Sequence, residues 1–254
     1  MANAAPSFTR SLPRLPRWAA AIAPDRSPAT TADLAHAVAR IDHSIDDRRV
    51  TDTPLINYWR YLLLLTWATA GVYPLLLLGR RVRRVDRFSR RKAPYYEALI
   101  DWTDLYAQQC GRSDANLHDL LGEARARVRA AYAGPLRPIG ARRAVLLTVG
   151  TFGLFGFFVL HRLNRYWWDA QVVEQEFDER LSVAWCRLGL IEYPLTFHPD
   201  SRGRRSFRRH LTAAALTLGG WAVVWDYRIH RDPDGLYTRF HSVEDAVRQV
   251  VRSP

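Results

Sequence analysis

One hydrophobic segment occurs three times in this chain of 254 residues, and it constrains the fold more than any other feature. The copies cover residues 61–79, 144–160 and 211–225. Shifting the first copy by 82 residues (151 − 69) places it on the second, and shifting it by 148 residues (217 − 69) places it on the third. All three share the pattern R-x8-T-x-G-x8-R-x2-R without gaps. Coincidence of five positions in two separate shifts indicates an internal repeat.

The length of the repeated segment fits a lipid bilayer. Arg60 and Arg80 bound the first copy, and the 20 residues between them span about 30 Å as a helix, which is the thickness of the hydrocarbon core. Arginines at both ends can extend to lipid headgroups. The alternative, three buried helices of a soluble core, fits poorly because the leucine runs 62–65 and 75–78 leave no polar face. We therefore predict an all-α membrane protein. The residues predicted to meet the membrane interface and anionic lipid headgroups are Arg60, Arg80, Arg83, Arg142, Arg162, Arg165, Arg208, Arg228 and Arg231.

Helix-weakening residues stand at the middle of every copy and leave two arrangements open. Glycine there allows either close packing of short straight spans or a turn that makes each segment a re-entrant hairpin. Straight spans would divide the flanking basic residues almost evenly between the two sides, which disagrees with the excess expected in cytoplasmic loops. Hairpins that enter and leave by the cytoplasmic face are therefore favoured. The predicted turn or packing residues are Thr69, Gly71, Thr151, Gly153, Thr217 and Gly219.

Amphipathic and polar helices are predicted between the hydrophobic segments. Apolar stripes predict helices over residues 31–48 and 113–133, able to pack on each other or on a partner. The stripes are Leu34, Val38, Ile41 and Ile45, and Leu117, Leu121, Ala124 and Val128. Polar helices are expected over 93–110 and 166–189, and a last helix begins at Ser242. The predicted division is a disordered extension (1–29), an amphipathic helix (30–53), repeat 1 with its polar helix (54–110), a second amphipathic helix (111–137), repeat 2 (138–200) and repeat 3 (201–254).

No motif in the chain carries a recognisable reaction. Glu174, Glu176, Asp178 and Glu179 are interpreted as a solvated or ion-paired helix face, and His241 with Glu244 as part of a helix cap. His161 and His210 stand at segment ends, where contact with a pigment or haem stays open beside a plain interfacial role. The basic runs 80–92 and 202–209 adjoin hydrophobic segments, which favours anionic lipid over nucleic acid. We expect no enzyme, no cofactor, no metal site and no nucleic-acid partner.

The centre of the repeat resembles a bacterial family. Thr69-Ala-Gly-Val-Tyr73, Thr151-Phe-Gly-Leu-Phe155 and Thr217-Leu-Gly-Gly-Trp221 resemble the "TLGIY" segments of YjgN-like and related inner-membrane proteins, and Arg162-Leu-Asn-Arg165 is similar to the sequence that follows them. The resemblance covers the three segments only, and most leucine and isoleucine positions of the motif differ. It implies an inner-membrane location and transfers no activity.

These observations favour a non-catalytic integral membrane subunit or scaffold. We expect it on the cytoplasmic face of a bacterial inner membrane, in a larger complex with other membrane subunits. Repeats with broken helices make a small transporter or channel-like protein the alternative. Almost no ionisable residue lies inside the segments, which counts against transport. A membrane-bound enzyme is the third possibility, without a motif to support it.

Overall fold

The structure is a computed structural model that describes residues 30–53, 55, 57–60, 69, 72–194, 199, 206–218 and 220–254. All regular structure in these residues is helical, as the sequence predicts. The predicted extension, residues 1–29, and the repeat glycines Gly71 and Gly219 lie outside the described residues.

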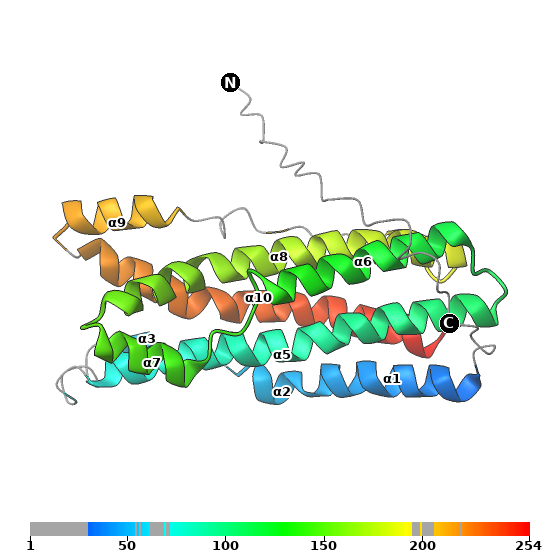
Figure 1. Ribbon diagram of the computed structural model, residues 1–254, viewed down its shortest axis with the longest axis horizontal. Helices are drawn as coiled ribbons and strands as arrows, with labels where there is room; N and C mark the ends of the chain where they lie inside the picture. Colours follow the sequence, from blue (N-terminus) through cyan, green and yellow to red (C-terminus); the bar gives the residue numbers. More distant parts are fainter. Residues whose placement is uncertain are drawn as a thin grey trace, which may run out of the picture.

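Three long helices run along the longest axis of the molecule and all begin at the same end (Figure 1). They are α5 (Val72–Gln109), α8 (Leu154–Leu188) and α10 (Gly220–Arg252). Each begins inside one hydrophobic segment and continues through the polar residues that follow. The separate polar helices predicted over 93–110 and 166–189 are therefore the distal halves of α5 and α8. The predicted start at Ser242 is wrong, because this residue lies inside α10 and its Oγ donates to the carbonyl of Arg239 at 2.8 Å.

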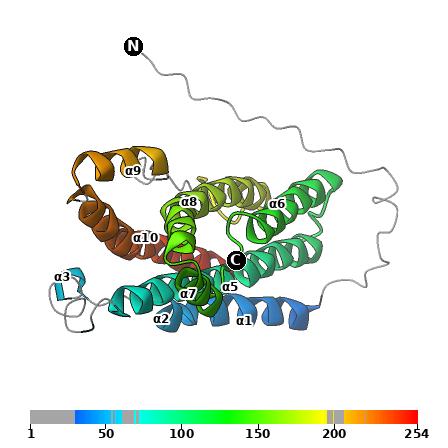
Figure 2. The ribbon, with the colours of Figure 1, turned by 60° about the vertical axis from the view of Figure 1, so that its left-hand side comes forward.

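Two short helices fold back on the starts of α8 and α10. Helix α7 (Ala141–Gly150) precedes α8, α9 (Phe207–Leu216) precedes α10, and each pair forms a helical hairpin (Figure 2). The short helix α3 (Tyr58–Arg60) lies at the same end of the molecule. We call this the hairpin end. No helix of the described part of the chain has both the length and the apolar character that a membrane crossing requires.

The hairpin of the second copy is closely packed, and Gly156 permits the approach. A Cβ atom at Gly156 would stand 3.1 Å from Cγ2 of Thr148 on the opposite arm. Thr148 is buried and its hydroxyl donates to the carbonyl of Ala144 at 2.7 Å, so its polar group is satisfied within α7. A larger residue at position 156 would separate the two arms.

The other half of the bundle is completed by α1 (Thr31–Asp46) and α6 (Ala115–Ala133), with the short α2 (Arg48–Thr51) between α1 and the hairpin end. Thr30 and Asp33 cap α1 reciprocally. Asp114 caps the start of α6, and Gly134 follows its last residue. Both apolar stripes pack in one core with side chains of α5, α8 and α10. The two stripes are thus buried against other helices of the same chain.

Candidate functional site

The turn of the second hairpin is built from three consecutive residues. Thr151 ends α7, Phe152 has a φ of 49° and Gly153 a φ of 91°, both in the left-handed region. This backbone reverses the chain at the residues where the sequence places its helix breakers. Phe152 carries a side chain in a conformation that glycine adopts more easily. The turn therefore exposes a large apolar side chain at some conformational cost.

The three repeat threonines make the same hydrogen bond. The Oγ1 atoms of Thr69, Thr151 and Thr217 accept from the backbone N–H four residues later, at 3.0, 2.9 and 2.8 Å. Each threonine carbonyl also accepts from the N–H three residues later. Leu218 repeats the left-handed backbone of Phe152, with a φ of 48°. The three copies thus share the threonine hydrogen bonds, and the second and third also share the left-handed residue after the threonine.

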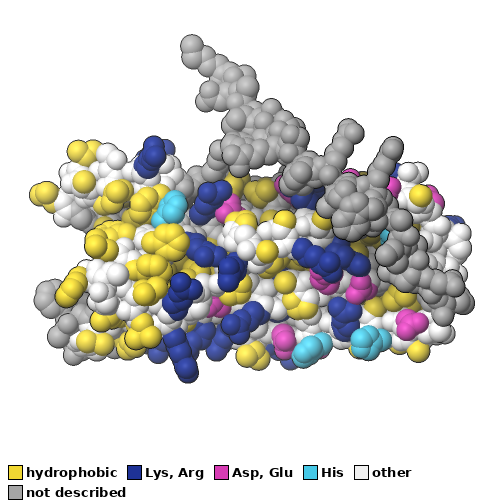
Figure 3. Space-filling view, in the orientation of Figure 1, with side chains coloured by type: hydrophobic (Ala, Val, Ile, Leu, Met, Phe, Trp, Pro, Cys, Tyr) yellow, Lys and Arg dark blue, Asp and Glu magenta, His cyan; other side chains and the backbone are white. Residues whose placement is uncertain are grey.

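Apolar side chains cover the hairpin end without any contact to bury them in the described chain. Phe152 is 100% exposed and Leu218 is 98% exposed. Other large exposed apolar side chains of the three segments are Val72, Leu76, Leu146, Leu147, Val149, Leu154, Phe157, Phe158, Leu211, Leu216, Val223 and Val224. Figure 3 shows hydrophobic side chains gathered at this end of the molecule. So large an apolar surface is typical of a protein or membrane contact.

Arginines form a collar beside this apolar surface. The repeat arginines Arg80, Arg162 and Arg228 each stand eight residues after the start of a long helix (80 − 72, 162 − 154, 228 − 220), about 12 Å along its axis. Figure 3 shows the resulting band of basic side chains next to the hydrophobic end. We define the arginine collar as the nine predicted residues, of which Arg162 is half-buried and the others are exposed: Arg60, Arg80, Arg83, Arg142, Arg162, Arg165, Arg208, Arg228 and Arg231.

Both flanks of the second segment lie on one side of its turn. A guanidinium nitrogen of Arg162, from α8, donates to the carbonyl of Arg137, which precedes α7. Exposed Arg142 lies in the first turn of α7. Exposed Arg165 lies about one turn after Arg162 and pairs with Asp169 at 3.1 Å. In the third copy, Arg228 stacks over the ring of Trp221 at 5.6 Å from its centroid. The second hairpin therefore brings the two arginine-bearing ends of its segment together.

The basic run 80–92 has an inner face that the sequence interpretation missed. Arg81, Arg84, Arg91 and Lys92 are buried, so the assignment of the whole run to lipid is wrong for these four residues. Arg81 pairs with Asp226, through Nη2 and Oδ2 at 3.0 Å, and Arg84 pairs with Asp234. These pairs join α5 to α10. The spacing is three residues from Arg81 to Arg84 and seven from Arg84 to Arg91, which marks one helix face and could have revealed it.

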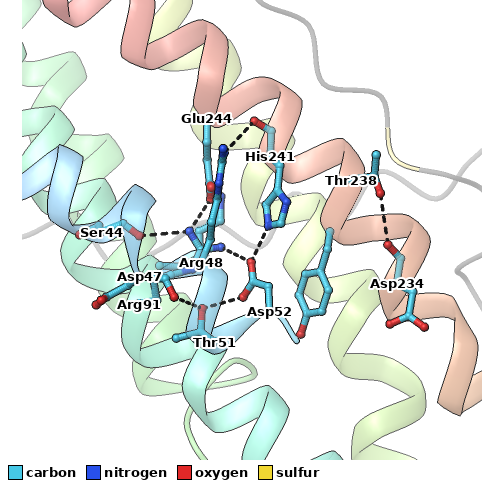
Figure 4. Close-up of polar contacts among 12 residues, drawn as sticks. Ser44, Asp47, Arg48, Thr51, Asp52, Arg91, Asp234, Thr238, His241 and Glu244 are labelled. Carbon is cyan, nitrogen blue, oxygen red and sulfur yellow. Dashed lines mark hydrogen bonds and ion pairs between the residues drawn. The ribbon is translucent and has the colours of Figure 1, made fainter. Parts of the chain in front are cut away.

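A second polar cluster lies in the core of the bundle, and Figure 4 shows the part of it around Asp52, Arg91, His241 and Glu244. We call it the buried ion network, and it comprises Asp52, Arg91, Lys92, Glu174, Asp178, His241 and Glu244. Lys92 is fully buried and its Nζ lies 2.8 Å from Glu174 and 2.9 Å from Glu244. Arg91 lies 2.8 Å from Glu244 and 2.7 Å from Asp52, which also contacts His241 Nε2 at 2.8 Å. The network ties α5, α8 and α10 to residue 52.

Burial and neighbouring charges have opposite effects on the pKa values of Lys92 and Asp52 in the network. Burial alone would lower the pKa of Lys92, but Glu174 and Glu244 outweigh burial and raise it. Burial tends to raise the pKa of Asp52, but its hydrogen bond with His241 and the charge of Arg91 lower it. The acidic residues were predicted to form a solvated or ion-paired helix face. Glu174 is buried but ion-paired with Lys92, in agreement with the second alternative, whereas buried Asp178 fits neither. Glu176 and Glu179 lie outside the core. His241 and Glu244 lie in the middle of α10 and belong to no cap.

Asp178→Asn tests the one carboxyl that the network leaves without a basic partner among the described residues. Its Oδ2 is buried without a hydrogen bond there, and burial together with Glu174 raises the pKa of Asp178 well above 3.8. Above pH 3.8 the folded state therefore binds more protons at this group than the unfolded state, so stability falls as pH rises towards the folded pKa. We expect Asp178→Asn to be at least as stable as the wild-type protein at neutral pH and to lose part of this slope.

Chemical unfolding at a series of pH values measures the effect. Glu179→Gln is the matched control, because Glu179 is exposed on the next position of the same helix. The control should keep the wild-type slope. An unchanged slope in Asp178→Asn would show that its carboxyl is ionised in the folded protein.

His161 and His210, for which the sequence left contact with a pigment or haem open, both contact other side chains of the protein. His210 is buried, accepts at Nδ1 from Trp221 Nε1 at 2.9 Å and stacks on Trp225. His161 is exposed and its ring meets Phe207 edge-on. In the parts of the chain that the structure describes, no group of histidine, cysteine and acidic side chains could hold a metal ion.

Comparison with known proteins adds no assignment. No protein-family model, no curated protein and no solved structure matches the chain. The resemblance to YjgN-like proteins therefore stays a prediction.

Proposed function

We propose that the protein is a non-catalytic integral membrane protein that inserts three helical hairpins into the cytoplasmic leaflet of a bacterial inner membrane. The observation that carries this proposal is the apolar hairpin end bordered by the arginine collar. Ten residues of α7 reach about 15 Å, half of a hydrocarbon core about 30 Å thick. The collar would then stand at the headgroups while the turns approach the bilayer centre.

The distribution of charge supports entry from the cytoplasmic side. Both arginine-bearing flanks of the second hairpin lie on the same side of its turn. Anionic lipids and basic residues both favour the cytoplasmic face. The rest of the bundle, including the buried ion network, would stand in the cytoplasm. Within a larger membrane complex, such a protein would serve as a subunit or scaffold, with other subunits contacting a surface other than the two stripes. Copurification in mild detergent would identify them.

Cysteine labelling tests the topology. In a chain without Cys110 and Cys186, we expect Arg90→Cys, Arg143→Cys and Arg165→Cys to be protected from impermeant reagents in intact cells and labelled in inverted vesicles. These three residues are exposed and flank the first two segments. Phe152→Cys and Leu218→Cys should resist the reagent on both sides. External labelling of Arg90→Cys and Arg143→Cys, with Arg165→Cys protected, would establish alternating spans and refute the hairpins.

A further inference from the structure

A groove between α5 and α7 changes in character along its length. Its apolar part encloses about 440 Å³ and is lined by Leu76, Gly79, Val145 and Leu146, with Arg80, Arg83, Ala141 and Arg142 at the margin. The adjoining part encloses about 800 Å³ and shares Arg83, Ala141 and Arg142 with the first. Its other residues are Asp86, Arg87, Arg90, Gly140 and Arg143. The two cavities therefore form one groove with an apolar half towards the hairpin end and a basic half away from it.

The basic half holds positive charge that the described protein does not neutralise. Five exposed arginines line it, and none has an ion pair or hydrogen bond with a described residue: Arg83, Arg87, Arg90, Arg142 and Arg143. The neighbouring arginines Arg81, Arg84 and Arg91 on the inner face of α5 all pair with acids. The arginines on the inner face of α5 are therefore paired with acids, whereas those on its outer face are not paired with any acid of the described chain.

The single acid in the groove does not supply those anions. Asp86 is buried, and its two carboxylate oxygens accept from the backbone N–H groups of Ile139 and Gly140 at 2.7 and 2.9 Å. The carboxylate of Asp86 therefore binds the backbone just before α7 and does not pair with an arginine of the groove. The electrostatic field of the groove is therefore that of the five arginines, which suits a phosphate because guanidinium groups bind its oxygens in pairs.

The apolar half decides which phosphate-bearing molecule fits. Gly79 keeps α5 close to α7, since a Cβ atom there would stand 3.0 Å from Cγ2 of Val145. Leu76 and Leu146 are exposed beside Gly79 and Val145, and their side chains add only apolar surface to this half of the groove. A free phosphate would use only the basic half. A phosphate joined to a hydrocarbon chain would use both halves at once.

We propose that this groove is a specific site for one anionic glycerophospholipid. Its phosphate lies between Arg83 and Arg142, which line both halves, and an acyl chain follows Leu76, Val145 and Leu146 towards the bilayer centre. The proposal rests on membrane insertion of the hairpin end and goes beyond it by distinguishing one lipid site from the rest of the arginine collar.

Lipid retention by the full chain tests the site. The protein is reconstituted in vesicles of phosphatidylcholine with phosphatidylglycerol, extracted in mild detergent, and its bound lipid counted by native mass spectrometry. We expect the wild-type protein to retain phosphatidylglycerol in preference to phosphatidylcholine. Arg83→Gln with Arg142→Gln should weaken this retention at least about tenfold, since charge-assisted contacts are lost. Glycerol phosphate, which lacks acyl chains, should not displace the lipid.

A matched double variant separates a site from diffuse attraction. Arg208→Gln with Arg228→Gln removes the same charge from the collar outside the groove and should keep the preference for phosphatidylglycerol. Equal losses in both double variants, displacement by glycerol phosphate, or retention without preference would each overturn the lipid site. Flotation of the protein with pure phosphatidylcholine vesicles reports on the proposed function separately. Failure to float with any vesicle would refute membrane insertion itself.

Discussion

Aspartate at both Phe152 and Leu218 is expected to release the protein from membranes. These two side chains stand at the turns of the second and third hairpins and are almost fully exposed. In the proposed orientation they approach the bilayer centre, where an aspartate costs about 2.5–3.5 kcal/mol on insertion scales. Two such substitutions should lower partition into vesicles by more than about a thousandfold. Flotation with vesicles measures the effect directly.

The control for this variant is Val183→Asp. Val183 is an exposed apolar residue in the distal part of α8, 29 residues beyond its first residue (183 − 154). This substitution should leave flotation unchanged. Because the wild-type side chains at 152 and 218 contact little of the chain, the double variant should also keep its helical circular dichroism and thermal unfolding. Flotation of the double variant at the wild-type level would show that the hairpin end does not enter the bilayer.

Lys92→Met is expected to destabilise the folded protein by about 3–5 kcal/mol, the usual cost of removing one partner of a buried ion pair. The substitution leaves Glu174 and Glu244 buried, each without its contact to the Nζ atom at 2.8 and 2.9 Å. It also removes a cation that lies 5.0 Å from the ring centroids of Tyr95 and Phe240. Chemical unfolding in detergent measures the loss.

A double variant distinguishes charge from packing. Lys92→Met with Glu174→Gln removes one uncompensated carboxylate and should recover part of the lost stability. Lys92 is the only lysine of the chain, so an amine-reactive reagent reports on its burial without interference from other side chains. In the wild-type protein, Lys92 should react only on unfolding. Rapid labelling of Lys92 in the native state, or wild-type stability for Lys92→Met, would refute the buried ion network.

Local patterns predicted the helices and the breaks between them. The stripes of α1 and α6 were visible because apolar residues recur at helical spacing, and the structure buries Ile41 and Leu121 as expected. Thr151 and Gly153 could be recognised as a break because they recur at the same place in the repeat. The break is a local property of the backbone, and for that reason sequence alone could predict it.

The buried ion network could not be predicted in the same way. Arg91 and Lys92 stand in a run of basic residues, and Glu174 and Asp178 stand among other acids, so each resembles a solvated surface until its partner is known. Their partners are 39 to 153 residues away along the chain. Only the packing of α5, α8 and α10 brings them together. The groove between α5 and α7 likewise depends on two helices meeting, although Arg83 and Arg142 were both recognised from the repeat.

The paired arms also affect the dipoles of the helices. A helix end carries about half an elementary charge, positive at the N-terminus and negative at the C-terminus. At the turn of the second hairpin, the negative end of α7 meets the positive end of α8, and α9 and α10 repeat the arrangement. Thr151 links the two ends through one hydroxyl, which donates to the carbonyl of Leu147 at 2.7 Å and accepts from the N–H of Phe155 at 2.9 Å. Opposite half-charges that meet in this way largely cancel, so a hairpin presents far less polarity to hydrocarbon than a single helix that ended at the same depth.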